Sequence, residues 1–228
     1  DNFFQFKKTR TYLKEKGLLK KDTYRKEIKL ILGDAREKLK INNKFDLTLT
    51  SPPYGDNHTT VTYGQYSYLP LSWIDLQDID KKISSEYLEN FSMIDSMSLG
   101  GRNIDNLKKD EYLKNISPTY SKYAKIFKDK PRELLNKLTS FFYDLDRTLN
   151  PLCENLNDNG YLVWTLGNRT VGGINIKLDQ VLIELFKSKN IKLIYIFYRP
   201  IPNKRMPSKN KSTNTMTKET ILILQKSI

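Results

Sequence analysis

An apolar strand that runs directly into two consecutive prolines is the feature that most restricts the fold of this chain. Residues 45 to 50, FDLTLT, are rich in strand formers, and Ser51-Pro52-Pro53-Tyr54 follows without a break. Proline has no N–H and fixes its own backbone, so the strand ends in a stiff, extended peptide with rigid carbonyl acceptors. A proline-rich turn or a polyproline ligand is the alternative interpretation.

Apolar runs elsewhere predict further strands, which define the fold class. The strands expected besides 45–50 cover residues 27–32, 161–166, 191–198 and 219–224. The run YLVWTL at 161–166 is apolar at nearly every position, which predicts a mid-sheet strand buried on both faces. The loop of about 20 residues before 219–224 has no room for a crossover helix, so the last strand should pair antiparallel with its predecessor as a long hairpin.

Helical patterns lie between these strands. Residues 131–152 place apolar side chains on one stripe behind Pro131 at a plausible first helical position, and 177–189 repeats the pattern. A short helix of about two turns is expected between Asp34 and Lys44. Alternation of strand and helix predicts an α/β fold, with a parallel sheet covered by helices on both faces.

The chain is expected to hold one domain behind a basic segment. We assign residues 1–26 to a basic N-terminal segment and 27–228 to the domain, with a less regular insertion at about 55–128 that is rich in Tyr and Lys. We expect this insertion to take part in recognising a target. No repeat and no linker divides the domain into two cores.

Charge suggests the partner. The chain has 228 residues and a formal net charge of +13, and its Lys and Arg are scattered along it, so nucleic acid is the first partner to consider and a merely basic protein is the alternative. One cysteine, Cys153, and one histidine exclude a disulfide framework and a zinc cluster of the usual ligands, and no metal is expected. With no membrane span and no signal peptide, a cytoplasmic location is expected.

The strand ending in Ser51-Pro52-Pro53-Tyr54 also places that peptide where open α/β sheets bind ligands, beyond the carboxyl ends of their strands. Here the chain resembles the S-adenosylmethionine-dependent DNA amino-methyltransferases, whose catalytic tetrapeptide is [Asp/Asn/Ser]-Pro-Pro-[Tyr/Phe/Trp]. The serine form is most similar to the N4-cytosine enzymes, whereas Asp or Asn is more typical of N6-adenine enzymes. Gly33-Asp34-Ala35 resembles the family's acidic position beside the cofactor adenine. The closing hairpin resembles the family's sixth and seventh strands, the latter antiparallel.

The resemblance implies a Rossmann-like methyltransferase sheet, of which this chain holds strands three to seven, and a role for each matched residue. The Pro52 carbonyl and Ser51 would accept the hydrogens of a target amine as preorganised electrostatic stabilisers, with Pro53 stiffening the peptide. Tyr54 would stack on a base flipped from double-stranded DNA. Asp34, Ala35 and Ser51 would contact S-adenosylmethionine. A bacterial restriction-modification system, acting on nucleoid DNA, is the implied context.

Methylation of a cytosine at carbon 5 would instead require a cysteine nucleophile. Cys153 lies in Leu-Cys-Glu at a helix end and is better interpreted as part of the core.

Basic and aromatic residues near the active edge are candidates for DNA contacts. Tyr63, with Tyr66, Tyr68 and Trp73, could line a DNA cleft, although a loop core is the favoured interpretation of these aromatics. A solvated charge run is the alternative for the basic loop at 199–218. The candidate DNA-binding residues are His58, Tyr63, Arg169, Arg199, Lys204, Arg205, Lys209 and Lys211.

Two parts of the family's pattern are missing from the chain. The Gly-rich turn of the Phe-x-Gly-x-Gly type and the following acid for the cofactor ribose are both absent, since Gly100-Gly101 follows no strand and the glycines at 167–173 follow the wrong one. We therefore hypothesise that a complementary segment or subunit supplies the cofactor half. An N6-adenine enzyme, a DNA-binding subunit without catalysis, and an RNA substrate are the remaining alternatives.

Overall fold

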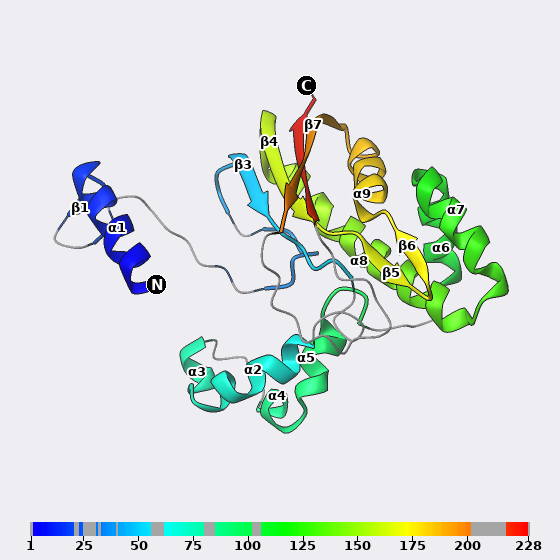
Figure 1. The fold of residues 1–228 in the computed structure, drawn as a ribbon, viewed down its shortest axis with the longest axis horizontal. Helices are drawn as coiled ribbons and strands as arrows, with labels where there is room; N and C mark the ends of the chain where they lie inside the picture. Colours follow the sequence, from blue (N-terminus) through cyan, green and yellow to red (C-terminus); the bar gives the residue numbers. More distant parts are fainter. Residues whose placement is uncertain are drawn as a thin grey trace. The chain divides into compact units, whose positions relative to one another are not determined.

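The computed structural model contains two compact units, residues 1–33 and 34–228, and each is described by itself (Figure 1). The first unit comprises helix α1 (Asn2–Glu15) and a small antiparallel hairpin of β1 (Leu19–Lys20) and β2 (Thr23–Tyr24). The residues that the structure describes are 2–20, 23–24, 31, 33–39, 41–55, 62–79, 85–101, 106–201 and 218–227.

A four-stranded mixed sheet forms the centre of the second unit, in the order β3-β4-β8-β7. β3 (Phe45–Thr50) and β4 (Leu156–Leu166) are parallel, whereas β8 (Lys218–Lys226) runs antiparallel to both β4 and β7 (Ile191–Pro200). The predicted hairpin of the last two strands and the mid-sheet position of β4 are thus confirmed. The sheet is mixed rather than parallel, because β8 separates β4 from β7.

The helices of the second unit include the two that sequence periodicity predicts. α8 (Arg132–Asn155) is amphipathic and buries its apolar stripe, and Pro131 is its N-cap, so the helix begins one residue later than expected. α9 matches the helix expected at 177–189. A two-stranded ribbon, β5 (Arg169–Val171) and β6 (Ile174–Ile176), precedes α9. The helical segments are α2 (Tyr63–Ser72), α3 (Leu76–Ile79), α4 (Glu86–Glu89), α5 (Phe91–Met97), α6 (Leu107–Ile116), α7 (Pro118–Ile126), the 3-10 turn Phe127–Asp129, α8 (Arg132–Asn155) and α9 (Leu178–Lys187).

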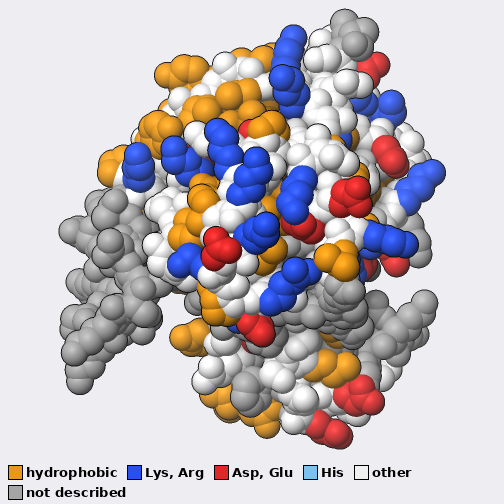
Figure 2. Space-filling view, turned by 90° about the vertical axis from the view of Figure 1, so that its right-hand side faces the viewer, with side chains coloured by type: hydrophobic (Ala, Val, Ile, Leu, Met, Phe, Trp, Pro, Cys, Tyr) orange, Lys and Arg blue, Asp and Glu red, His pale blue; other side chains and the backbone are white. Residues whose placement is uncertain are grey.

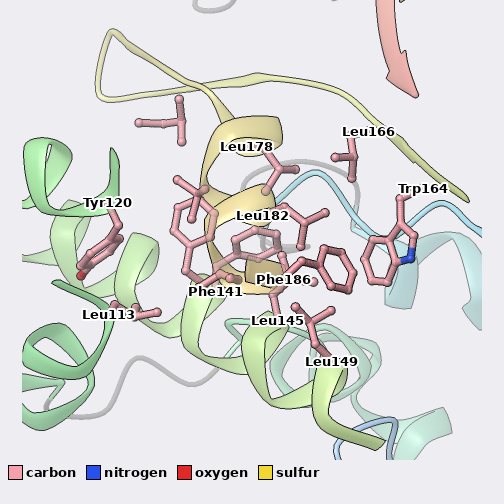
Figure 3. Packing of buried hydrophobic residues seen from close by; sticks show 14 of the residues in the cluster. Leu113, Tyr120, Phe141, Leu145, Leu149, Trp164, Leu166, Leu178, Leu182 and Phe186 are labelled. Carbon is pink, nitrogen blue, oxygen red and sulfur yellow. The ribbon is translucent and has the colours of Figure 1, made fainter. Parts of the chain in front are cut away.

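The hydrophobic core lies between one face of this sheet and the helices α8 and α9 (Figure 3). Trp164 of β4 packs edge-on against Phe186 of α9, with ring centroids 5.2 Å apart, and both side chains are almost fully buried. Leu113 of α6 and Tyr120 of α7 extend the same core away from the sheet. Burial of so many large side chains is the main source of stability for this unit.

The opposite face of the sheet is apolar and exposed at its two outer strands and half-buried in the middle, so the described residues do not show the expected helices on both faces. Strand register places Leu49, Val163, Ile223 and Tyr195 in one row across all four strands. Leu49 at the β3 edge is 73% exposed and Tyr195 of β7 is 61% exposed. The sequence pattern of β4 is apolar at almost every position because both faces are made for burial, yet only the face of Leu162 and Trp164 is buried here.

Two further expectations fare differently. Residues 34–39 and 41–44 form turns, bends and irregular backbone, so the short helix predicted there is wrong. In this segment the Asp34 carboxylate accepts from the backbone N–H of Arg36 at 2.8 Å, and turns of this kind compete with helix formation. Most of the strand predicted at 27–32 lies outside the described residues, and Ile31 belongs to no strand.

Among the helices that the structure describes, none is both long enough and apolar enough to cross a membrane.

Candidate active site

The tetrapeptide Ser51-Pro52-Pro53-Tyr54 lies at the carboxyl end of β3. Thr50, the last residue of β3, pairs with Trp164 of the parallel strand β4, so both strands run out at the same edge of the sheet. Arg169 begins β5 shortly after β4 ends. β7 also ends and β8 begins at this edge, since β8 is antiparallel to both of its neighbours. The tetrapeptide and the two ends of the loop between β7 and β8 therefore lie at the same end of the sheet.

The hydroxyl of Tyr54 contacts one residue of its own tetrapeptide and one residue of strand β8. It lies 3.4 Å from the Ser51 Oγ and donates to Oε1 of Glu219, at the start of β8, over 3.3 Å. Arg199, at the end of β7, donates from Nε at 3.0 Å and from a terminal nitrogen at 2.5 Å to the other carboxylate oxygen of Glu219. Tyr54 is thus the near end of a chain of contacts that reaches the farthest strand.

The electrostatic surroundings of Tyr54 keep its phenol neutral. Burial raises the pKa of Tyr54 above its ordinary value, and the neighbouring Glu219 carboxylate acts in the same direction. The hydrogen bond from Ser51 and the charge of Arg199 oppose this rise in pKa but do not cancel it. A neutral phenol remains a hydrogen-bond donor, which suits a contact with a carboxylate.

Gly55 directly after the tetrapeptide makes room for Arg169. A Cβ atom placed on Gly55 would lie 1.5 Å from a terminal nitrogen of the Arg169 guanidinium and 2.3 Å from its Cζ. Only glycine therefore lets this guanidinium cross so close to the backbone that follows Tyr54. Arg169, a sequence-based candidate for DNA contact, is placed at the tetrapeptide by this packing.

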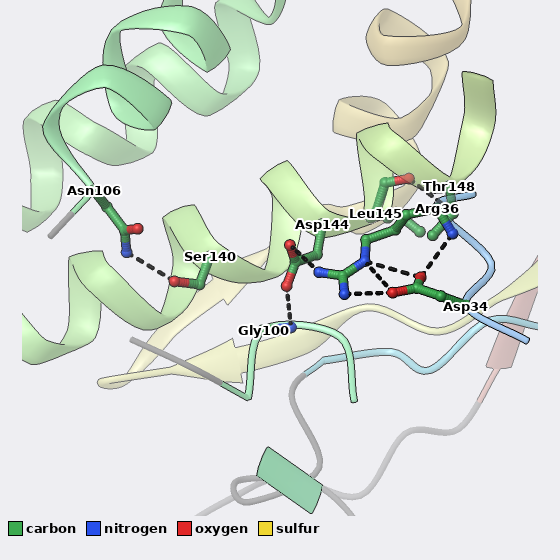
Figure 4. Close-up of polar contacts among 8 residues, drawn as sticks. All are labelled: Asp34, Arg36, Gly100, Asn106, Ser140, Asp144, Leu145 and Thr148. Carbon is green, nitrogen blue, oxygen red and sulfur yellow. Dashed lines mark hydrogen bonds and ion pairs between the residues drawn. The ribbon is translucent and has the colours of Figure 1, made fainter. Parts of the chain in front are cut away.

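Asp34, expected beside a cofactor adenine, forms an ion pair with Arg36 (Figure 4). The Arg36 guanidinium donates to both Asp34 carboxylate oxygens over 2.6–3.1 Å and reaches Asp144 of α8 at 3.3 Å. Asp144 in turn accepts from the backbone N–H of Gly100 at 3.1 Å. The hydrogen bond from Arg36 is the main cause that lowers the pKa of Asp34. Arg36 therefore links Asp34 to helix α8. Ala35 lies exposed in the turn between Asp34 and Arg36.

Of the remaining candidate DNA-binding residues, some lie within the described residues and some lie outside them. Tyr63 begins α2 and is 50% exposed, and the Arg199 side chain is 63% exposed while its guanidinium binds Glu219. Those outside the described residues are His58, Lys204, Arg205, Lys209 and Lys211.

The aromatic side chains after the tetrapeptide do not form the loop core that the sequence favoured. They lie on and just after helix α2, where Tyr66 is 73% exposed and Trp73 is 88% exposed. Gly64, by contrast, is buried, and its N–H donates to the Asp95 carboxylate at 3.0 Å. The loop-core interpretation is therefore wrong for these rings.

The described residues do not complete a site for S-adenosylmethionine. Ser51 and the proline carbonyls offer acceptors at the edge of the sheet, but the Asp34 carboxylate is already engaged by Arg36. The sequence also lacks the Gly-rich turn that would approach the methionine part of such a cofactor. The tetrapeptide therefore fits the acceptor side of a methyl transfer better than it fits cofactor binding.

Sequence reasoning missed Glu219 and Gly55. Glu219 lies 165 residues from Tyr54, so no local pattern could join them. One signal was present, since the predicted hairpin pairs Arg199 with Glu219 at its root and opposite charges favour such a cross-strand pair. For Gly55 the only signal was its position immediately after Tyr54.

Comparison with characterised sequences gives one informative match. Over 189 residues, or 79% of this chain, the sequence is 39% identical to the type II methyltransferase M.MvaI of Kocuria varians. The match covers 40% of that relative's length, so the chain spans well under half of the protein it resembles. Comparison with protein-family models gives no match.

Among solved structures, the chain is similar to a protein of Thermus thermophilus described provisionally as a DNA modification methylase. The similarity covers 53% of this chain and 50% of that one, with 18% sequence identity and a TM-score of 0.32. A TM-score this low supports no conclusion about the fold.

Proposed function

We propose that this chain is the catalytic part of a DNA methyltransferase that transfers a methyl group from S-adenosylmethionine to the exocyclic N4 amine of a flipped cytosine. The observation that carries the proposal is Ser51-Pro52-Pro53-Tyr54 at the carboxyl end of β3, with the Tyr54 hydroxyl held by Glu219. The 39% identity with a type II methyltransferase supports it and favours a restriction-modification system as the context. Such an enzyme would act in the bacterial cytoplasm on nucleoid DNA.

The tetrapeptide suits an amine acceptor because the lone pair of a cytosine amine is conjugated into the ring. Acceptors placed on the two amine hydrogens rotate or pyramidalise the nitrogen and free its lone pair for the methyl group. We assign this task to the Pro52 carbonyl and to Ser51. The ring of Tyr54 stacks on the flipped base, and its tied hydroxyl fixes the plane of stacking.

Double-stranded DNA is the proposed substrate because the chain is strongly basic. Lys and Arg side chains are spread over the face of the molecule that Figure 2 shows, with fewer acidic side chains between them. The loop between β7 and β8 carries Lys204, Arg205, Lys209 and Lys211 in its sequence, and both of its roots lie at the tetrapeptide edge. Basic side chains beside a flipped base would hold the phosphates on either side of it.

A complementary segment or subunit is proposed to supply the cofactor half. The exposed apolar side chains Leu47, Leu49, Tyr161 and Tyr195 on one face of the sheet support this, since contiguous apolar sheet faces are normally covered. β3 is an edge strand of the described sheet and could accept a further strand. The matched relative is longer than this chain, so a segment of the same polypeptide could provide the cover for the apolar face and the further strand beside β3.

Methyl transfer from labelled S-adenosylmethionine to DNA, followed by nucleoside analysis, tests the proposal. The complete protein should yield N4-methylcytosine, and residues 1–228 alone should be inactive. Ser51→Ala and Tyr54→Ala should abolish transfer while DNA affinity stays within a few fold.

Three other outcomes each point to a different conclusion. N6-methyladenine would replace cytosine by adenine as the target. Tight cofactor binding and full activity of residues 1–228 alone would remove the complementary segment. No transfer by the complete protein, with DNA or RNA still bound, would leave a nucleic-acid-binding module and refute the proposed reaction.

A further inference from the structure

The side chain of Tyr54 connects two strands that are not neighbours in the sheet. Tyr54 follows β3, Glu219 is the second residue of β8, and β4 lies between these two strands. Two strand spacings are about 9.6 Å, which is too wide for one side chain and suits a tyrosine and a glutamate that meet over the carboxyl end of β4. The contact therefore ties the tetrapeptide to the β7–β8 hairpin.

The carboxylate of Glu219 is divided between two partners. Its Oε2 accepts from Arg199 through both Nε and a terminal nitrogen, and these two charge-assisted hydrogen bonds hold that end of the carboxylate. Its Oε1 is thereby directed at the Tyr54 hydroxyl. The side chain of Glu219 is only 17% exposed, whereas that of Arg199 is 63% exposed, so the carboxylate is largely buried while its arginine partner faces solvent.

A contact of 3.3 Å is long for O–H···O and would be weak if the carboxylate could move. Arg199 removes that freedom, because it is the cross-strand partner of Glu219 at the root of the hairpin. The ring of Tyr54 is partly buried and packs against the hydrophobic core, while its hydroxyl reaches Glu219. Anchoring its hydroxyl limits rotation of the ring about the side-chain bonds.

We propose that Glu219, oriented by Arg199, is a positioning residue that sets the ring of Tyr54 for the methyl-transfer reaction. This inference rests on the proposed function. Glu219 touches neither the base nor the methyl group in this scheme. It acts through Tyr54, and a ring displaced by about 1 Å can cost a catalyst up to a hundredfold in rate.

The test is a double-variant cycle in the complete protein, measured by single-turnover methyl transfer to saturating DNA. Tyr54→Phe removes the hydroxyl but keeps the ring, and Glu219→Ala removes its acceptor. Each should lower the transfer rate on the order of tenfold. Because both remove the same contact, the double variant should be no slower than the slower single variant.

Conservative and control variants separate positioning from general stability. Glu219→Gln keeps an acceptor oxygen for Tyr54 and should recover part of the rate lost in Glu219→Ala. Lys192→Ala serves as the matched control, since Lys192 is an exposed basic residue on the same strand as Arg199, at the far end of the hairpin. It should leave the rate unchanged.

Failure of this inference is distinguishable from failure of the proposed function. If the wild-type protein methylates DNA and Glu219→Ala slows Tyr54→Phe by the same factor as it slows wild type, Glu219 does not act through Tyr54. The positioning role is then refuted while the reaction stands. If the complete wild-type protein transfers no methyl group, both proposals are wrong.

Discussion

At the scale of single residues, the contact between Gly55 and Arg169 makes a sharp prediction. In Gly55→Ala the new methyl group would overlap the Arg169 guanidinium, which is the mobile end of a long side chain and can move away. We expect methyl transfer to fall on the order of tenfold, because the guanidinium leaves the tetrapeptide. Thermal unfolding should shift by only a few degrees.

The matched control is the double variant Gly55→Ala/Arg169→Ala. If Arg169 contributes to the reaction, the double variant should be as slow as Arg169→Ala alone. A Gly55→Ala protein with full activity would show that the close approach of these two residues has no role in the reaction.

Asp34 gives a prediction on pH. Arg36 lowers the pKa of Asp34 in the folded protein, so the ion pair contributes stability above the unfolded pKa of about 3.9 and loses it as pH falls through the lower folded pKa. Asp34→Asn should cost roughly 0.5–1 kcal/mol at pH 7, because the pair is partly exposed and screened by solvent.

The measurement is urea unfolding of wild type and Asp34→Asn from pH 7 down to pH 3. Their difference in stability should shrink toward zero at the acidic end. A difference that stays constant with pH would mean that the carboxylate charge is not what stabilises this turn.

At the scale of helices and strands, the sequence predicted the elements with strong periodicity. α8 and α9 repeat apolar residues at helical spacing, and β4, β7 and β8 each contain a largely apolar run. The short helix expected after Asp34 rested on Ala35 and Leu39 alone, and the Asp34 turn outweighed it.

The helices α2 to α7 were not anticipated within the region 55–128. Their first members are short or weakly amphipathic, so their sequence carries little of the pattern that marks a helix.

Helix α8 also determines how reactive the single cysteine is, because it buries the thiol. Cys153 is buried there, and burial raises its pKa to about 11. At pH 8 its thiolate fraction should be roughly a hundredfold below that of a free thiol, so iodoacetamide should label it very slowly in the folded protein. Labelling should become fast in denaturant.

Cys153→Ala should retain methyl transfer, because the proposed amine chemistry needs no thiol nucleophile. Rapid labelling of the native protein, or loss of transfer in Cys153→Ala with the fold intact, would contradict the assignment of this residue to the core.

At the scale of the whole molecule, the two faces of the sheet should differ in how much a substitution lowers the stability. Leu49→Lys lies on the exposed face and should change the stability of residues 1–228 by less than about 0.5 kcal/mol. Leu162→Ala, on the buried face of the neighbouring strand, should cost roughly 2–5 kcal/mol.

In the complete protein the first of these variants becomes informative. If a complementary segment covers the exposed face, Leu49→Lys should lower methyl transfer and thermal stability together. Unchanged activity and stability in the complete protein would show that nothing packs on Leu49.

At this scale the sequence identified the candidate site through one rare tetrapeptide, since the edge of the sheet follows from a strand that ends there. The contacts that complete the site could not be predicted, because Arg169 and Glu219 reach it through the tertiary fold. The one-sided cover of the sheet was also hidden, since the strands carry apolar residues for both faces.

The position of β8 between β4 and β7 has a consequence for synthesis on the ribosome. β4 and β7 form hydrogen bonds with β8 and not with each other, so the four-stranded sheet cannot be completed until residues 218–226 have been made. Pairings this distant in sequence form late and slow folding. Glu219 arrives with that strand, long after Tyr54 has left the ribosome. A nascent chain therefore carries the tetrapeptide without the anchor of its tyrosine until β8 has been made, and catalytic competence would come only with the completed sheet.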